Sequence, residues 1–347
     1  ENELTVMEQP EKKNISISIV VPVYNRPDET DALLGSIARQ AENGLDYEVI
    51  IVEDGSSLTS QAECEKWSAT LPVRYFYTEN SGPGDSRNYG MEHARGDYFV
   101  ILDSDVLLPE NYFQTLERLL SRRNPADAFA GPDRAHRSFT DVQKAINYAM
   151  TSFLTTGGLR GGSKANISGR RQLRSYNMVI SAEAFRRAGG FAHQRVGEDI
   201  EYTQRLWRND LTTAWYPELY VYHKRRDTLG QFFRQTMAFG RARPILNRMF
   251  PGTARLTYMF PSFFLVFLLV SLVGGMFAPV ILLPLGVYLA AILLSSWTQN
   301  RSLRVGILSV AAAVVQFTGY GWGFLYSNIR MLYLDDVDKV FPYMFKH

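Results

Sequence analysis

Cysteine is almost absent from this chain of 347 residues, in which Cys64 is the single one. One cysteine makes no intrachain disulfide and no cysteine cluster for zinc, so a secreted disulfide scaffold is excluded. A charge excess is also missing, because 37 Lys and Arg residues balance 35 Asp and Glu residues to a net charge of +2. A nucleic-acid partner is therefore not expected, since such binders usually carry a strong basic excess. The hydrophobic content of 46% excludes wholesale disorder.

Two long stretches contain no charged residue: 45 residues at 256–300 and 25 residues at 305–329. A membrane span needs about 20 apolar residues, so the first stretch is long enough for two spans and the second for one. We therefore predict a membrane region at 256–329, with spans near 258–277, 280–298 and 305–327, and a tail at 330–347. The third segment contains Gln316 and three nearby glycines, so it also suits a re-entrant or interfacial helix.

Charge is distributed unevenly along the chain. Residues 1–223 hold 24 basic and 31 acidic side chains, whereas 224–255 hold one acidic residue and a basic collar of eight: Lys224, Arg225, Arg226, Arg234, Arg241, Arg243, Arg248 and Arg255. The positive-inside rule places the collar and the domain before it in the cytoplasm. The collar is a topology signal, and it also suits contact with anionic headgroups or a lipid diphosphate. We expect a polar tail without a signal peptide at 1–13, a catalytic domain at 14–228 and a basic amphipathic interfacial segment at 229–255.

Apolar runs rich in β-branched residues alternate with helical patterns in the first third of the chain. We predict strands at 15–23, 47–52, 73–77 and 98–102, and helices at 28–40, 60–70, 86–95 and 111–122. Apolar strands alternating with helices indicate a parallel sheet covered on both faces. Ligands bind beyond the carboxyl ends of such strands, where this sequence places Tyr24-Asn25, Glu53-Asp54 and Asp103-Ser104-Asp105. The pattern predicts a nucleotide-binding α/β domain.

Two acidic motifs carry candidate chemistry. Asp103 and Asp105 follow a buried strand, where they can bind Mg²⁺ or Mn²⁺ together or form an ordinary acidic turn. Asp199 starts a predicted helix at 197–208, as a cap or as a general base. His223 ends an extended run at 213–223 and is either a structural histidine or a further metal ligand. Arg87 opens a helix after a Gly-Pro-Gly turn, where it suits capping or phosphate contact.

Five motifs in order, VPVYNRP, IIVEDGS, GPGDSRNYG, YFVILDSD and GGFAHQRVGED, closely resemble the family-2 inverting glycosyltransferases over about residues 15–243. The resemblance implies the GT-A fold, an α/β doubly wound mixed sheet, here followed by an all-α membrane region. Many bacterial members carry C-terminal membrane helices and build exopolysaccharide or O-antigen-type glycans on polyprenyl carriers.

The resemblance also implies roles for single residues. Pro22, Tyr24 and Asn25 would line the donor pocket, Glu53 and Asp54 would bind the base, and Arg87, Asp103 and Ser104 would approach the ribose and phosphates. Asp105, with Asp103 and His223, would hold Mn²⁺ or Mg²⁺. Asp199 would be the catalytic base, and Glu198 beside it would position the acceptor.

Processive members of this superfamily carry a Gln-x-x-Arg-Trp element, whereas Gln231 and Arg234 are followed here by Gln235. The missing Trp and the small number of spans favour addition of a single sugar. Gln231, Arg234 and Arg160, the last in a Gly- and Arg-rich loop at 156–171, are candidate contacts to the acceptor or diphosphate. The other interpretation of Gln231 and Arg234 is that they belong to an interfacial amphipathic helix at 229–243.

The expected protein is a multi-pass enzyme of the bacterial inner membrane with a cytoplasmic catalytic domain. It would move one sugar, preferably from a UDP-sugar, to a hydroxyl of a polyprenyl-linked glycan, with the lipid bilayer as a further partner. A polyprenyl-phosphate glycosyl synthase is a second hypothesis, with the lipid phosphate as acceptor. A catalytically inactive membrane scaffold is a third, and the retained Asp103, Asp105 and Asp199 count against it.

Overall fold

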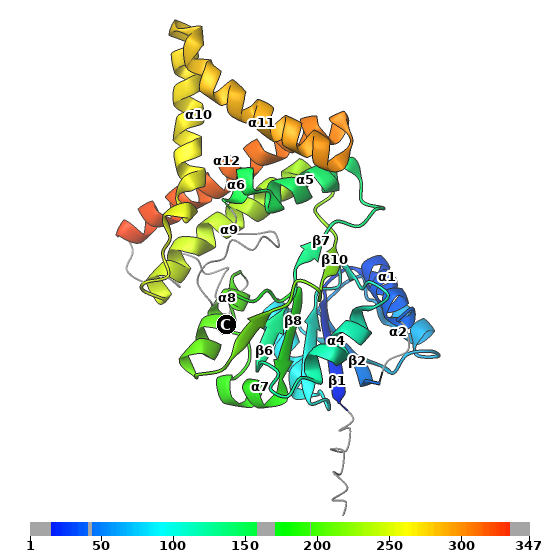
Figure 1. Cartoon of the computed structure of the whole chain (residues 1–347). Helices are drawn as coiled ribbons and strands as arrows, with labels where there is room; N and C mark the ends of the chain where they lie inside the picture. The colour runs from blue at the N-terminus through cyan, green and yellow to red at the C-terminus, as the bar shows by residue number, and fades with distance from the viewer. Residues whose placement is uncertain (1–14, 41–43, 158–170, 195, 334–347) are drawn as a thin grey trace, which may run out of the picture.

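The computed structural model describes residues 15–40, 44–157, 171–194 and 196–333 (Figure 1). A seven-stranded sheet forms the centre of the N-terminal part, in the order β3-β2-β1-β4-β8-β6-β9. The first four strands of this order are parallel, β8 is antiparallel to β4 and β6, and β9 is parallel to β6. Its strands are β1 (Ser16–Val23), β2 (Asp46–Asp54), β3 (Val73–Thr78), β4 (Tyr98–Leu102), β6 (Ala128–Ala130), β8 (Asn177–Ser181) and β9 (Thr213–Trp215).

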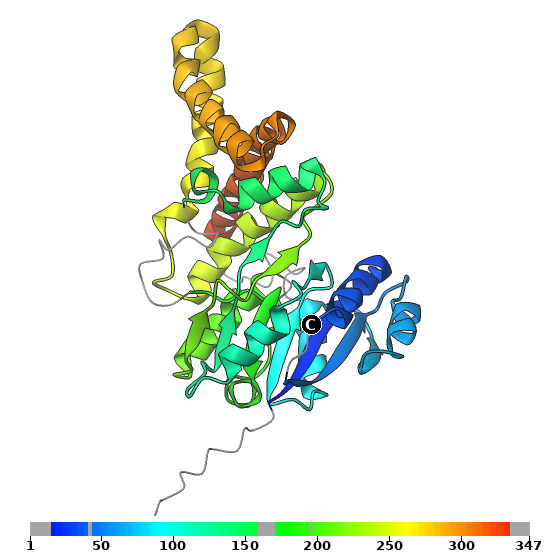
Figure 2. The same cartoon turned by 45° about the vertical axis from the view of Figure 1, so that its right-hand side comes forward.

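Helices cover both faces of this sheet (Figure 2). Successive residues of a strand point to opposite faces, so Ile19 and Val21 of β1 pack with α1, α2 and α4, whereas Val20 packs with α3, α7 and α8. The resulting doubly wound mixed sheet confirms the predicted fold class. These helices are α1 (Pro27–Ala38), α2 (Gln61–Trp67), α3 (Pro83–Glu92), α4 (Tyr112–Leu120), α7 (Ala182–Ala188) and α8 (Glu198–Arg208).

A second, three-stranded sheet joins distant segments beside the carboxyl ends of β1 and β4. Its order is β5-β10-β7, from Val106–Leu107, Val221–His223 and Asp133–Arg134. The antiparallel register sets His223 opposite Val106, and the backbone N–H of Lys224 donates to the carbonyl of Asp105 over 2.9 Å. This pairing carries His223 to the end of β4.

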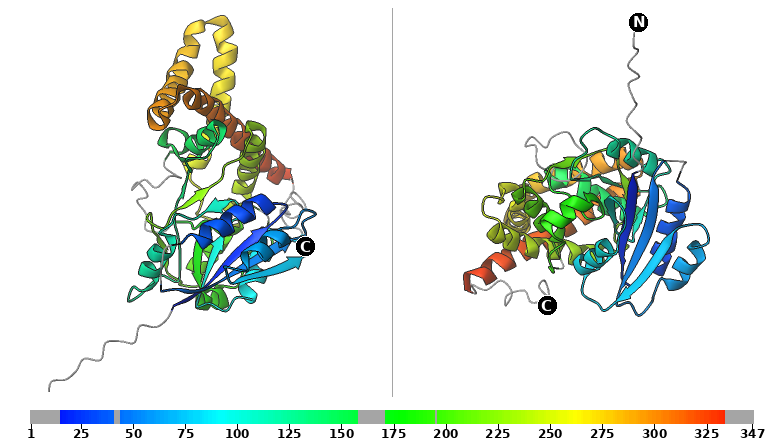
Figure 3. Two further views of the ribbon diagram at one scale, coloured as in Figure 1. Left: turned by 90° about the vertical axis from the view of Figure 1, so that its right-hand side faces the viewer. Right: turned by 90° about the horizontal axis from the view of Figure 1, so that it is seen from below.

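The C-terminal part is helical and projects from the sheet domain (Figures 1 and 3). Helix α9 lies between the domain and α12, and α10 and α11 form a hairpin above them. Three helical stretches, Phe260–Phe277, Pro279–Asn300 and Leu303–Tyr333, are long and apolar enough to cross a membrane. The elements are α5 (Asp141–Thr151), α6 (Phe153–Thr156), α9 (Leu229–Met249), η1 (Leu256–Tyr258), α10 (Phe260–Phe277), η2 (Pro279–Leu282), α11 (Leu283–Asn300) and α12 (Leu303–Tyr333).

The strands β5 to β8 were not predicted, and three further differences concern the segments around the site. The predicted extended run at 213–223 divides into β9 and β10, which belong to different sheets. Helix α5 was not predicted, and it packs on α9 and α12 although it lies within the interval assigned to the catalytic domain. The predicted interfacial helix at 229–243 continues to Met249 through Pro244. These three differences have one physical reason. Where the local preference for helix or strand is weak, contacts with residues distant in sequence decide how far the segment extends and what it packs against.

Glycines allow α12 to lie directly on α9. A Cβ added to Gly323 would lie 2.3 Å from the carbonyl oxygen of Met237, and one added to Gly240 would lie 2.2 Å from that of Tyr320. Both contacts involve backbone atoms, which cannot rotate out of the way. Small residues at helix interfaces permit such close backbone approach in membrane proteins. The third apolar helix is therefore packed against the segment that adjoins the sheet domain.

We predict that Gly323→Ala lowers the stability of the protein, because the added methyl group forces α12 away from α9. Overpacking of this kind costs roughly 1–3 kcal/mol. Thermal unfolding in detergent should show a lower Tm for the variant. Gly286→Ala in α11 is the matched control, since nothing lies within 4 Å of its added Cβ. Equal Tm values for the two variants would contradict the close packing.

Candidate active site

The carboxyl ends of β1, β2 and β4 open into one large cavity of about 2010 Å³. Parallel neighbouring strands bring these ends to the same edge of the sheet, which is why residues far apart in sequence meet there. Six of the predicted donor and metal residues line the cavity at this edge: Pro22, Tyr24, Asp54, Asp103, Ser104 and Asp105. Arg87, Glu198, Asp199, His223, Gln231 and Arg234 line it as well.

Asp103, Asp105 and His223 form a cluster that suits a divalent metal ion. One ligand atom from each residue lies within 4.8 Å of the others. The buried Asp105 Oδ1 accepts no hydrogen bond from any described residue, although His223 Nε2 lies 3.0 Å from it. Carboxylate oxygens and a neutral imidazole are suitable ligands for such an ion. The structure thus brings the three candidate ligands of the sequence analysis close together, and their role as metal ligands stays a prediction.

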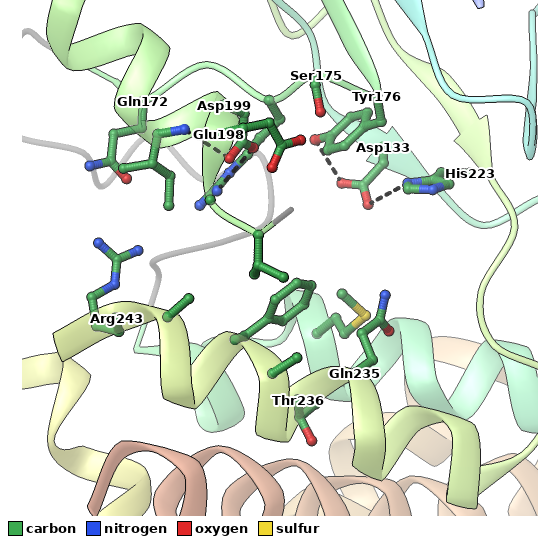
Figure 4. Close-up of a pocket in the computed structure, with 18 of the residues that line it drawn as sticks. Asp133, Gln172, Ser175, Tyr176, Glu198, Asp199, His223, Gln235, Thr236 and Arg243 are labelled. Atoms are coloured by element: carbon green, nitrogen blue, oxygen red, sulfur yellow. Dashed lines mark hydrogen bonds and ion pairs between the residues drawn. The ribbon is translucent and has the colours of Figure 1, made fainter. Parts of the chain in front are cut away.

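Asp133 is an additional residue of this centre that the sequence analysis missed. Its Oδ2 lies 3.8 Å from His223 Nδ1 (Figure 4), whereas Asp105 lies near the other ring nitrogen, Nε2. The same carboxylate pairs with Arg225 at 2.5 Å and accepts a hydrogen bond from the Tyr176 hydroxyl at 3.1 Å. At 3.8 Å the carboxylate interacts with the ring electrostatically, and Nδ1 of His223 has no hydrogen-bond partner among the described residues. No local sequence signal marks Asp133, because β7 meets β10 only in the folded chain.

The Asp105 and His223 side chains stabilise each other's charged forms. Burial disfavours both charges, but the contact with His223 outweighs it and lowers the pKa of Asp105 to about 2. Burial alone would lower the pKa of His223, but the Asp105 carboxylate outweighs burial, and the pKa of His223 is raised. Asp105 is therefore ionised at neutral pH, as a cation ligand must be.

Arg87 connects the metal cluster to the predicted catalytic motif. It is 3% exposed, and its guanidinium lies 2.8 Å from Asp103 Oδ1 and 2.7 Å from Glu198 Oε1. A buried ion pair of this kind is costly to break, because removal of one partner leaves an unpaired charge. Glu198, predicted to position the acceptor, is thus held by Arg87.

Asp199 faces the cavity from the first turn of α8 (Figure 4). Its Oδ2 lies 3.3 Å from Nη1 of Arg174, which the sequence analysis did not single out. Its Oδ1 accepts from the backbone N–H of Ile200 in the same first turn. The carboxylate is oriented by these two contacts and open to a ligand in the cavity.

The polar side-chain groups of three predicted donor-binding residues accept hydrogen bonds from other groups of the protein. Glu53 is fully buried, and its carboxylate accepts from Ser56 Oγ and from the backbone N–H of Ser60. Asn25 accepts from the backbone N–H of Leu58 and does not line the cavity. Asp54 lines it, but its carboxylate accepts backbone hydrogen bonds from the turn before α3. The structure brings neither Glu53 nor Asn25 to the cavity.

Two of the remaining predicted contacts, Gln231 and Arg234, belong to α9. Gln231 completes a capping box at the start of the helix, with its side chain bonded to the backbone of Thr228. Arg234 is exposed and lines the cavity. Arg160 lies outside the described residues. The interfacial and ligand-binding interpretations of Gln231 and Arg234 therefore both remain predictions.

Helix α9 forms the wall opposite the sheet edge, and apolar helices extend it. The cavity lining continues from Ala238 and Phe239 of α9 to Met150 and Leu154 of the α5–α6 segment. It also includes residues of α10 and α12: Phe260, Pro261, Phe263, Gln316 and Tyr320. One cavity thus joins a charged edge of the sheet to the surface of the membrane-type helices.

Residues 18–186 match the family described as Glycosyl transferase family 2. The validoxylamine A glucosyltransferase of Streptomyces hygroscopicus subsp. limoneus is 32% identical over 114 residues, which are 32% of this chain and 25% of that protein. The minor teichoic acid biosynthesis protein GgaB of Bacillus subtilis (strain 168) is 29% identical over 122 residues, or 34% of this chain and 14% of that protein. The chain thus spans at most a quarter of either relative.

A solved structure shares the fold over most of both chains. The mannosyltransferase PcManGT from Pyrobaculum calidifontis, in complex with GDP-Man and Mn²⁺, has a TM-score of 0.53. The match has 16% sequence identity and covers 93% of this chain and 88% of that chain. This similarity shows a GT-A fold, which the strand order described above also has.

We predict that Asp105→Ala abolishes the thermal stabilisation that a nucleotide diphosphate produces together with Mn²⁺. A ligand that binds only the folded protein raises its Tm, and the variant lacks a principal metal ligand. The assay compares UDP, GDP, CMP and dTDP, each with and without Mn²⁺, on the detergent-purified protein. Asp46→Asn, an exposed carboxylate at the start of β2, is the control and should respond like the native protein. A metal-dependent shift that survives in Asp105→Ala would contradict the metal assignment.

We predict that Glu198 makes the protein less stable as the pH rises from about 5 to 8. Burial raises its pKa to about 7, the Arg87 ion pair opposes this, and the Asp199 carboxylate adds to it. The unfolded chain then holds fewer protons than the folded one in this range, so stability falls as pH rises. Glu198→Gln should flatten the plot of Tm against pH. The exposed Glu183→Gln should not change it, and equal slopes for all three proteins would show that Glu198 does not titrate as expected.

Proposed function

Because residues 18–186 of this chain are a glycosyltransferase family 2 domain, we propose that the protein is a sugar-transferring enzyme at a membrane. It would transfer one sugar from a nucleotide-diphosphate sugar to a lipid-linked acceptor. The observation that carries this proposal is the continuous cavity from the metal cluster to α9, α10 and α12. A donor nucleotide needs a charged surface, whereas a sugar carried on an apolar chain needs an apolar surface beside it. This cavity offers both, and its volume exceeds the roughly 300–1,000 Å³ of an ordinary small-molecule site.

The donor would bind at the carboxyl edge of the sheet. Asp103, Asp105 and His223 would hold the divalent ion, which supplies positive charge to stabilise the departing diphosphate. Arg87 orients Asp103 from behind through its 2.8 Å ion pair. Pro22 and Tyr24 would form the wall against which the base lies. UDP is the preferred nucleotide from the family resemblance.

Asp199 would act as the general base. It would accept the proton of the acceptor hydroxyl as that oxygen attacks the anomeric carbon, while the sugar–diphosphate bond breaks. A single displacement inverts the configuration, so an α-linked donor yields a β-glycoside without a covalent enzyme intermediate. Arg174 holds the Asp199 carboxylate over 3.3 Å, and Glu198 beside it lies at the acceptor side of the cavity.

The helical region supports a membrane location. The three apolar helices reach the length of a span, and most of α10 and α11 is exposed apolar surface. Arg304, at the start of α12, lies 3.4 Å from Asp141 of α5, so the return of the α10–α11 hairpin lies on the same side as the sheet domain. This agrees with a bacterial inner-membrane enzyme whose catalytic domain is cytoplasmic. The similarity to GgaB favours an acceptor in cell-envelope polysaccharide synthesis.

A second candidate function is transfer to the phosphate of a polyprenyl phosphate. The observation that favours it is the position of Arg174 at Asp199, because a guanidinium there can bind a phosphate acceptor. In that reaction the phosphate oxygen is already ionised and needs no general base. The two functions differ in product, a monophosphate-linked sugar or an extended lipid-linked glycan, and in their dependence on Asp199.

We predict that Asp199→Asn lowers sugar transfer by roughly 10²–10⁴-fold, the usual contribution of a general base. Nucleotide and Mn²⁺ should still stabilise the variant, because Asp199 is not a metal ligand. Transfer is measured with a radiolabelled UDP-sugar and membrane lipid extract, and the thermal shift is measured on the same sample. Asp210→Asn, an exposed carboxylate beyond the end of α8, should keep full activity.

Near-normal turnover by Asp199→Asn would contradict the hydroxyl-transfer mechanism and favour the phosphate acceptor. A folded native protein that no nucleotide stabilises with Mn²⁺ would contradict both transferase proposals and support the membrane scaffold.

A further inference from the structure

We propose that Arg243, stacked on Tyr258, is a binding site for the phosphate group at the head of the lipid-linked acceptor. The inference rests on the function proposed above and specifies how its acceptor is recognised. Nothing in the sequence distinguishes Arg243 from the other arginines of the basic collar. Its surroundings in the folded chain do.

Arg243 is a buried cation without an anionic partner. It is 8% exposed, and among the described residues no carboxylate forms an ion pair with it and no group accepts a hydrogen bond from it. Its one recorded contact is with the Tyr258 ring, whose centroid lies 4.2 Å from the guanidinium carbon. Burial of an unpaired charge is strongly unfavourable. An anionic ligand would remove this cost.

Two other buried arginines of the site, and the half-buried Arg174, show the contrast. Arg87 pairs with Asp103 and Glu198, Arg174 with Asp199, and Arg225 with Asp133. Each of these guanidiniums thus already has a carboxylate partner within the protein. Arg243 lines the same cavity with its charge uncompensated.

The position of Arg243 suits an acceptor rather than the donor. It projects from α9 on the wall opposite Glu198 and Asp199, whereas the metal cluster with His223 lies at another part of the cavity (Figure 4). Tyr258, which holds the guanidinium, belongs to η1, just before α10. The next lining residues are Phe260, Pro261 and Phe263 of α10. A phosphate at Arg243 would have apolar surface on one side and the candidate base on the other.

The chemistry of the side chains favours a phosphate ester. A guanidinium presents paired N–H donors that match two phosphate oxygens, and stacking on an aromatic ring leaves these edge donors free. Arg174 lines the same cavity as Tyr258 but is already paired with Asp199. Arg255, exposed at the cavity wall, adds a further positive charge where η1 begins. A lipid phosphate or diphosphate is therefore the class of ligand we infer.

The test uses the full chain in neutral nanodiscs, with farnesyl phosphate and farnesyl diphosphate as probes and farnesol and inorganic phosphate as controls. Binding is followed by thermal shift and by competition with sugar transfer. For the native protein we expect farnesyl phosphate and farnesyl diphosphate to bind. Farnesol and inorganic phosphate should bind at least roughly tenfold more weakly, because farnesol lacks the phosphate and inorganic phosphate lacks the apolar chain. Equal binding of farnesol would overturn the proposal.

Arg243→Gln should weaken farnesyl phosphate binding by roughly tenfold or more. Arg243→Lys should weaken it by a smaller factor, because lysine keeps the positive charge but lacks the paired N–H donors. Both variants should keep the thermal shift with nucleotide and Mn²⁺, which shows that they are folded and that the donor site is intact. Arg248→Gln, exposed on the same helix outside the cavity lining, is the matched control and should bind like the native protein.

Three further outcomes would overturn the proposal: unchanged farnesyl phosphate binding in Arg243→Gln, loss of nucleotide binding in place of lipid phosphate binding, or displacement of the probe in a second set of nanodiscs that contain phosphatidylglycerol. The last would assign Arg243 to bilayer headgroups. A native protein that binds no nucleotide with Mn²⁺ would instead contradict the proposed function, so the two failures are distinguishable.

Discussion

The pairing of β10 with β5 and β7 is the interaction on which the rest of the site depends. These strands contain two or three residues each, yet their register places His223 beside Asp105 and Asp133 behind its ring. The chain leaves β10 and soon enters α9, so the same pairing sets where α9 crosses the carboxyl edge of the sheet. The metal cluster and the far wall of the cavity therefore have one structural origin.

Buried arginines organise the charges around this cavity. Arg87 joins the metal cluster to the α8 motif, and Arg174 and Arg225 each hold one carboxylate in place. Because an ion pair is costly to break in a buried setting, these contacts fix the carboxylates more firmly than surface pairs would. Arg243 departs from this rule, because no carboxylate of the described residues pairs with it, and the proposed acceptor site rests on this difference.

The apolar helices are packed into the enzyme and are more than an anchor. Close glycine contacts seat α12 on α9, and α5 of the sheet domain's sequence packs on the same pair. The cavity lining passes across these helices without interruption. A substrate with an apolar chain could reach the sheet edge along them, which relates the membrane region directly to the transfer reaction.

The sequence by itself determined the apolar strands, the acidic residues at their ends, the three apolar helices and the family, because these features depend on periodicity and on the order of short motifs. It also brought Asp103, Asp105 and His223 together as candidate ligands through the family resemblance. Tertiary structure alone decided that Glu53 and Asn25 accept hydrogen bonds from local backbone and hydroxyl donors, that Asp133 lies beside His223 and Arg174 beside Asp199, and that no carboxylate of the described residues pairs with Arg243. The reason is physical: a polar side chain's role depends on which groups from distant segments reach it, and a sequence pattern carries no record of those distances.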